Sequence, residues 1–113
     1  MRRGEIYTAA AKGAYAGKPR PVAVIQDDLF DATASITVCP FTSSPVDAPL
    51  LRIQVEPSHQ NGLEASSSLM VDKITTIPKS NLGERLGALT DEQLVRLNRS
   101  LMVFLGLASS PRS

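Results

Sequence analysis

The stretch PVAVIQ, at residues 21–26, decides how this chain folds. It is apolar, rich in β-branched side chains and six residues long, which is typical of a central β-strand. Pro21 suits the first position of such a strand, where a missing backbone N–H costs least. A second apolar run follows at residues 35–41, and we expect another strand there.

Shorter extended segments surround these two runs. Residues 50–56 alternate between apolar and polar side chains, and this period of two indicates a half-buried strand. Residues 27–32 predict one short helical turn that an aspartate caps. Three further segments have the residue types of short strands, at positions 5–10, 67–71 and 73–77.

The last part of the chain has a helical pattern. Thr90 and Gln93 form a capping box, in which each side chain bonds the other residue's backbone N–H. Leu89 before the cap and Leu94 after it are placed as a hydrophobic staple. Gly106 is a natural C-terminal stop, so we expect a helix of about 15 residues. Its apolar stripe, which should cover the sheet, is Leu94, Leu97, Leu101 and Phe104/Leu105.

These elements predict a mainly β protein with a C-terminal helix. Five or more short strands with Pro, Gly and Ser between them indicate a compact, strongly bent sheet or half-barrel. With 113 residues there is room for one domain, which we assign to residues 1–107. Residues 108–113 are expected to form a frayed tail, and the irregular residues 11–19 a loop.

Composition excludes several classes of protein. No apolar run approaches the roughly 20 residues that cross a bilayer, and GEIY follows Arg2 and Arg3 where a signal peptide would be apolar. We therefore expect a cytoplasmic protein without a membrane segment. Cys39 is the single cysteine and lies in an apolar run, where it should pack as a small hydrophobe. His59 lies among turn-forming residues and is a poor start for a metal site.

Charge is unevenly distributed along the chain, although the net charge is only +1. Residues 1–20 carry five cations and one anion, whereas the rest carries seven cations and ten anions. A basic N-terminal segment is compatible with a local phosphate site and equally with a solvated loop.

Arg20 and Thr42 are the candidates for chemistry. Arg20 stands between Pro19 and Pro21, which hold its backbone extended, and its planar guanidinium suits a phosphate. Thr42 ends the apolar strand, from which a hydroxyl can point into a cleft. Residue types alone leave two interpretations open, namely phosphate contacts, or an exposed loop arginine and a turn-forming hydroxyl cluster.

Four runs of sequence resemble the MazF/PemK family of toxins: RGEIY at 3–7, GKPRPVAVIQDD at 17–28, TVCPFTS at 37–43 and SLMVDKITTI at 68–77. The resemblance spans residues 3 to about 107, and includes Gly62-Leu63 and the terminal helix. The Arg-Pro step and the strand-ending Thr-Ser step are fairly specific together. Residues 11–16 and Asp72-Lys73 depart from the family pattern.

The resemblance implies a homodimeric, barrel-like SH3-type fold and an endoribonuclease that cuts single-stranded RNA at short sequences. It also implies a cognate antitoxin whose disordered tail occupies the RNA groove. In that family the active-site pair falls on Arg20 and Thr42, and the site uses no metal or cofactor. Attack of the RNA's own 2′-hydroxyl would give 2′,3′-cyclic phosphate and 5′-hydroxyl ends. The group that takes the 2′-proton is not identified at this point.

We expect further RNA contacts around this pair, from Lys18, Gln26, Asp27, Phe30, Ser43, Ser68, Asp72 and Lys73. Tyr15 and Phe30 are the aromatic residues placed to stack on bases, although Phe30 fits the core at least as well.

Two other functions compete with the nuclease. CcdB-type toxins share a related fold and poison DNA gyrase, but they rely on a C-terminal tryptophan and this chain has no tryptophan. The third alternative is a small non-catalytic barrel that binds RNA or protein.

Overall fold

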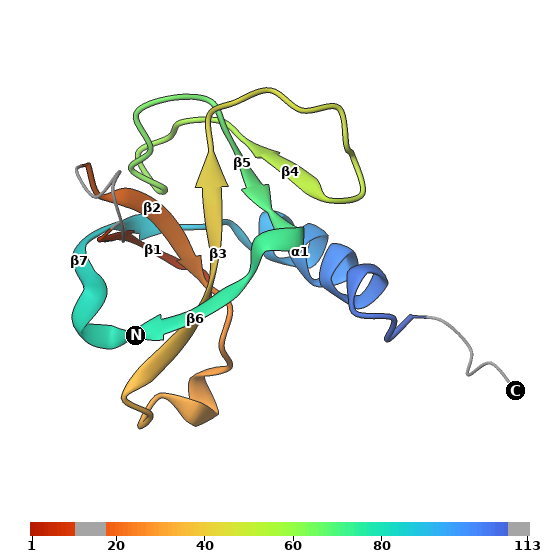
Figure 1. Ribbon diagram of the computed structural model, residues 1–113. Coiled ribbons are helices and arrows are strands. Elements are labelled where there is room, and N and C mark those ends of the chain that lie inside the picture. The colour runs from red at the N-terminus through yellow and green to blue at the C-terminus, as the bar shows by residue number, and fades with distance from the viewer. Residues whose placement is uncertain (11–17, 109–113) are drawn as a thin grey trace, which may run out of the picture.

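The computed structural model describes residues 1–10 and 18–108, which form a seven-stranded sheet, three short 3-10 helices and one α-helix (Figure 1). The strands are β1 (Glu5–Ala9), β2 (Arg20–Val24), β3 (Ser35–Thr42), β4 (Arg52–Val55), β5 (Ser67–Met70), β6 (Thr75–Pro78) and β7 (Leu82–Ala88). The helices are η1 (Asp28–Phe30), η2 (Val71–Lys73), η3 (Lys79–Asn81) and α1 (Asp91–Phe104).

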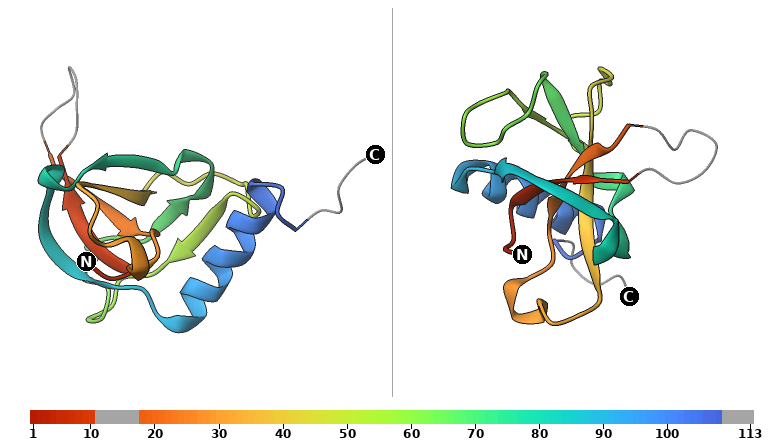
Figure 2. Two further views of the ribbon diagram at one scale, coloured as in Figure 1. Left: turned by 90° about the horizontal axis from the view of Figure 1, so that it is seen from below. Right: turned by 90° about the vertical axis from the view of Figure 1, so that its left-hand side faces the viewer.

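Strand β3 is the centre of the sheet. The strand order is β4-β5-β3-β2-β1-β7, and β6 pairs with the first half of β3 while β5 pairs with its last two residues. The views in Figure 2 show a strongly bent sheet with α1 along one side. The predicted mainly β fold with a C-terminal helix is confirmed. The sheet is not closed into a barrel, because β4, β6 and β7 each pair with a strand on one side only among the described strands.

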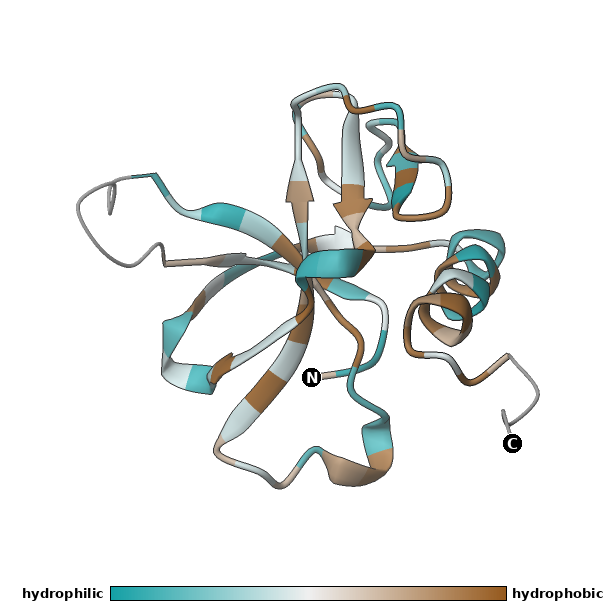
Figure 3. Ribbon diagram, turned by 45° about the vertical axis from the view of Figure 1, so that its right-hand side comes forward, coloured by the Kyte–Doolittle hydropathy of each residue, from teal (hydrophilic) through white to brown (hydrophobic). Residues whose placement is uncertain are grey.

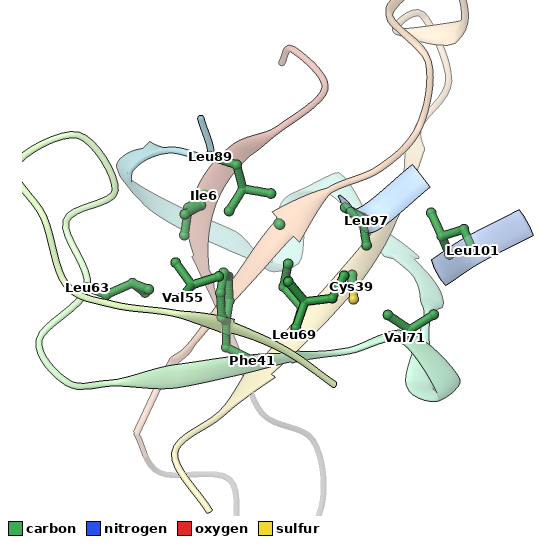
Figure 4. Packing of buried hydrophobic residues seen from close by; sticks show 12 residues of the cluster. Ile6, Cys39, Phe41, Val55, Leu63, Leu69, Val71, Leu89, Leu97 and Leu101 are labelled. Carbon is green, nitrogen blue, oxygen red and sulfur yellow. The ribbon is translucent and has the colours of Figure 1, made fainter. Parts of the chain in front are cut away.

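The central strands are buried on both faces, as the run at 21–26 predicted. Val22 and Val24 of β2 belong to one apolar cluster, whereas Ala23 between them belongs to a second, larger cluster. Strand β3 divides its residues in the same way. Figure 4 shows the larger cluster, where side chains of β3, β4 and β5 meet Leu97 and Leu101 of α1.

Helix α1 begins at the predicted capping box. The Thr90 hydroxyl accepts from the Gln93 N–H at 3.1 Å, and Gln93 accepts from the Thr90 N–H at 2.9 Å. Leu97 and Leu101 are buried, but the predicted stripe does not continue, because Phe104 is 42% exposed. Figure 3 shows the apolar colour of these last helical turns, which extend beyond the sheet.

Strand β7 was missed by sequence reasoning. Its sequence, LGERLGA, has two glycines and no β-branched residue, so it lacks a strand signal. It is a strand because it pairs with β1, with register shifts on either side of Tyr7. The loop predicted at 11–19 falls largely on residues outside the described ranges, as does the tail predicted at 108–113, apart from Ala108.

No helix within residues 1–10 and 18–108 is long and apolar enough to span a bilayer. The same ranges contain no group of three or more His, Cys, Asp or Glu side chains that could hold a metal ion. Cys39 is fully buried in the larger cluster, as predicted for a small hydrophobe. His59 is exposed in its turn.

Candidate nuclease site

The register of the central strands brings Arg20 and Thr42 together. In the antiparallel pair β2–β3, Val22 lies opposite Pro40 and Ala23 opposite Cys39. The same register continued by two residues places Arg20 opposite Thr42. Residues directly opposite in such a pair have Cβ atoms about 4.5–5.5 Å apart and point to the same face.

This pair belongs to a row of polar residues that crosses the sheet. Thr42 also lies opposite Ser68 of β5, and Ser68 lies opposite Gln54 of β4. All four side chains are on the face opposite the larger cluster, since their strand neighbours Phe41, Ile53 and Leu69 point into that cluster. We call Arg20, Thr42, Ser68 and Gln54 the polar row.

Two adjoining clefts lie along the polar row. The first, of about 440 Å³, is lined by Arg20 and Thr42 together with the predicted residues Lys18 and Ser43. The second, of about 500 Å³, shares Thr42 and Ser43 with the first and extends to the predicted residue Ser68. An extended ligand that runs along this end of the sheet would pass from one cleft into the other.

The Thr42 hydroxyl is arranged to donate. Its Oγ1 accepts the backbone N–H of Ser44 at 3.2 Å, which fixes the turn after β3. The hydroxyl proton is not used by that bond and can point toward an anion in the cleft. Beside it, the exposed Arg20 guanidinium brings five N–H donors and a permanent positive charge.

Three of the predicted RNA-binding residues lie at the other end of the same strands. Gln26, Asp27 and Phe30 belong to the connection between β2 and β3, at the η1 end in Figure 1. Gln26 donates to the Phe30 carbonyl at 2.8 Å and accepts the Thr37 N–H at 3.1 Å. Asp27 caps η1 by accepting the Leu29 N–H at 2.9 Å. The structure does not bring these residues to the clefts, and Phe30 is also not in the core, because it is 61% exposed.

Asp72 and Lys73 also lie away from both clefts. They form η2, which packs against α1. The Asp72 carboxylate pairs with the guanidinium of Arg52, whose side chain is only 13% exposed. This carboxylate therefore has a structural partner within the chain.

Sequence reasoning missed one charged residue of the first cleft, Glu64. It follows Gly62 and the buried Leu63 in the segment between β4 and β5. The turn formers before it gave a signal for a loop but none for a functional carboxylate.

Comparison with known proteins agrees with this geometry. The family model of the PemK-like, MazF-like toxin of type II toxin-antitoxin systems matches residues 2–105. A protein of Mycolicibacterium smegmatis named probable endoribonuclease MazF is 64% identical over 108 residues, which cover 96% of this chain and 99% of the relative.

Solved structures with the same fold include an endoribonuclease in complex with its cognate antitoxin, from a mycobacterial species. It has a TM-score of 0.80 at 23% identity, covering 97% of this chain and 99% of the other. A MazE–MazF structure from Deinococcus radiodurans has a TM-score of 0.79 at 19% identity, covering 96% and 97%. The family model and the 64% identical relative show the family, so this chain belongs to the PemK-like, MazF-like toxins of type II toxin-antitoxin systems.

Proposed function

We propose that this chain is the toxin of a type II toxin-antitoxin system and cuts single-stranded RNA at selected sequences without a metal ion. The observation that carries the proposal is the register that sets Arg20 beside Thr42 at an open cleft. The name of the 64% identical relative, probable endoribonuclease MazF, supports the same activity.

The proposed reaction uses the nucleophile that RNA itself carries. The 2′-hydroxyl attacks the adjacent phosphorus, and the bond to the 5′-oxygen breaks to leave 2′,3′-cyclic phosphate and 5′-hydroxyl ends. Arg20 stabilises the charge that develops on the phosphoryl oxygens, and Thr42 donates a hydrogen bond to a non-bridging oxygen. The protein's further contribution is to hold the RNA backbone splayed for in-line attack.

The remaining predicted RNA contacts differ in their support. Lys18 and Ser43 line the first cleft and Ser68 the second, so their positions favour contacts with RNA on either side of the cut. The other five predicted residues line neither cleft, so their positions do not support contacts with RNA bound there; they are Gln26, Asp27, Phe30, Asp72 and Lys73.

A defined single-stranded RNA, incubated with the protein in excess chelator and then mapped at its ends, tests the activity. Cyclic-phosphate ends are expected. Intact RNA in chelator, with cleavage restored by a divalent cation, would contradict metal independence. Intact RNA under both conditions would favour a gyrase inhibitor or a non-catalytic RNA-binding protein, which gyrase and RNA-binding assays distinguish.

We also propose that a cognate antitoxin inhibits the protein by occupying the clefts with a disordered tail. The solved neighbours that contain an antitoxin support this partner. The antitoxin should displace a labelled RNA from the protein, and RNA that stays bound beside the antitoxin would contradict a shared site.

A homodimer in the cytoplasm completes the proposal. The last turns of α1 and the residues after it leave apolar side chains uncovered, and a second copy would bury them. These exposed residues are Met102, Val103, Phe104, Leu105 and Leu107. Sedimentation should give a dimer, and Phe104→Glu should shift it toward monomer.

A further inference from the structure

The proposed reaction needs a group that takes the proton of the 2′-hydroxyl, and the first cleft contains one such group. Arg20 and Thr42 act as donors, and an arginine guanidinium stays charged and cannot accept a proton. Among the described residues that line this cleft, Glu64 alone carries an acidic side chain. We infer that Glu64 is the general base of the cleavage reaction; this inference rests on the proposed nuclease function.

Glu64 lies on a loop that the fold holds in place. Asn61, only 1% exposed, accepts the backbone N–H groups of Ser58 at 3.0 Å and Leu63 at 2.9 Å. Its amide also donates to the Glu56 carbonyl at 2.7 Å. Leu63, the residue directly before Glu64, points into the larger cluster near Val55 and Phe41 (Figure 4). The hydrogen bonds of Asn61 and the burial of Leu63 therefore hold the backbone just before Glu64 in place.

Two glycines, which have no side chain, allow the same loop to lie directly against β7. A Cβ atom on Gly62 would lie 2.1 Å from the Leu86 carbonyl oxygen, and one on Gly87 would lie 2.1 Å from the Gln60 carbonyl oxygen. Gly62 also has a positive φ of 67°, which side chains disfavour. The Ala88 N–H closes the contact by donating to the Gln60 carbonyl at 2.8 Å. A loop this close to a strand cannot slide, so it holds Glu64 at a fixed place on the rim of the cleft.

The chemistry of the step follows from this placement. A carboxylate group has free lone pairs and can accept a proton. Glu64 takes the proton of the 2′-hydroxyl as the bond from the 2′-oxygen to phosphorus forms. The bond from phosphorus to the 5′-oxygen breaks, and the 5′-oxygen takes a proton from water in the open cleft. The Glu64 carboxylic acid then returns its proton to solvent, so the enzyme is unchanged after one turnover.

Glu64→Gln tests the inference, because glutamine has the same shape but cannot act as a base. We expect the single-turnover rate of cleavage to fall about 100-fold, the lower end of what a general base contributes. Glu64→Asp, which keeps a carboxylate, should retain more of the cleavage rate than Glu64→Gln. Glu92→Gln, at the start of α1, removes the same charge far from the cleft and should cleave normally.

Binding and folding are measured on the same variants. Affinity for an RNA with a 2′-O-methyl group at the cut position should match the wild type within about twofold, and the thermal melting curves should coincide. A Glu64→Gln protein that cuts at the wild-type rate, or that loses RNA affinity in proportion to rate, overturns the role of base. A wild type that cuts no RNA overturns the nuclease function as well, so the two failures are distinguishable.

Discussion

The two ends of the β2–β3 pair carry similar polar residues, but only one of the two ends lines the clefts described above. At one end, Arg20 and Thr42 face a cleft. At the other end, the side chains of Gln26 and Asp27 form hydrogen bonds with the backbone of the connection in which they lie. Residue type is therefore a weak guide to function. The Gln26 amide uses both its oxygen and its nitrogen within the connection. The Thr42 hydroxyl accepts one backbone N–H but keeps its proton for a ligand in the cleft.

Chain connectivity explains the difference. At the η1 end, a single connection of residues 25–34 joins β2 to β3, and its backbone groups must find partners nearby. At the other end the two strands continue into unrelated segments, one arriving from residue 18 and one leaving at residue 43. The chain separates there, which leaves room for a cleft lined by Arg20 and Thr42.

We call the end of the β2–β3 pair that lines the cleft the open end, and the η1 end the closed end. The largest expected effect on cleavage belongs to substitutions at the open end. Arg20→Ala should slow cleavage by about 10²–10³-fold, because it removes a donor to the developing phosphoryl charge, and Thr42→Ala should do the same. Arg20→Ala should change the free energy of unfolding by less than about 0.5 kcal/mol. Thr42→Ala should cost about 1 kcal/mol, because the Ser44 N–H loses its acceptor. Cleavage rates and urea unfolding curves measure the two quantities.

Arg3→Ala is the matched control for the arginine. Arg3 donates its Nε–H to the Ile25 carbonyl at 2.8 Å, at the η1 end. It should lose stability and keep its cleavage rate when folded. Near-normal cleavage by Arg20→Ala would remove the contrast between the two ends.

The next effect belongs to the closed end. Gln26→Ala should lower the free energy of unfolding by about 1–3 kcal/mol, because the Thr37 N–H loses its acceptor and the Phe30 carbonyl loses a donor. The rate of cleavage by the folded protein should stay the same. Urea unfolding and single-turnover cleavage on one preparation measure both.

Gln54→Ala is the control for that substitution. Gln54 also makes two hydrogen bonds, to Glu56 and Ser66, but all three residues are exposed. Its loss should cost less than about 0.5 kcal/mol. Equal destabilisation by the two substitutions would show that the closed end is not specially supported by Gln26.

Most of the fold could be predicted from the sequence, because the signals were local. The runs at 21–26 and 35–41 and the capping box of α1 each carry their own pattern, and each formed the predicted element. Strand β7 exists through its pairing with β1, and the open edges depend on the whole strand order, so neither has a local signal.

The site was predictable to a smaller extent. Arg20 and Thr42 were predicted as the active-site pair from the Arg-Pro and Thr-Ser steps and the family resemblance, and both line the first cleft. Gln26 and Asp27 belong to the same run of sequence as Arg20, the family-like run at 17–28, and only the structure separates them from the cleft. Glu64 was missed because its position depends on Asn61, Gly62 and Gly87, which meet only after the chain has folded.

Acid should lower the contribution of Asp31, in the connection at the closed end, to the stability of the folded protein. A hydrogen bond from the N-terminal ammonium and the charge of Lys79 hold the pKa of Asp31 below its ordinary value of 3.8. A lowered pKa means that Asp31 stabilises the folded protein above pH 3.8 and loses this contribution as the pH falls through the folded value.

Asp31→Asn should therefore be less stable than the wild type near neutral pH, and the difference should vanish in acid. Unfolding curves from pH 7 to pH 2 measure it. A difference that persists at pH 2 would assign the effect to packing instead of charge.

The last effect concerns Cys39, which lies in β3 between the two ends. The Cys39 side chain is fully buried, and this burial raises the pKa of its thiol to about 12. Almost no thiolate is therefore present at pH 8. An alkylating reagent should therefore label it only when the β2–β3 pair opens. Gln26→Ala should speed labelling about tenfold for each 1.4 kcal/mol of destabilisation, whereas Arg20→Ala should leave it unchanged. Rapid labelling of the folded wild type would mean that β2 and β3 separate locally without unfolding of the whole protein. The two ends could then not be treated as parts of one rigid strand pair.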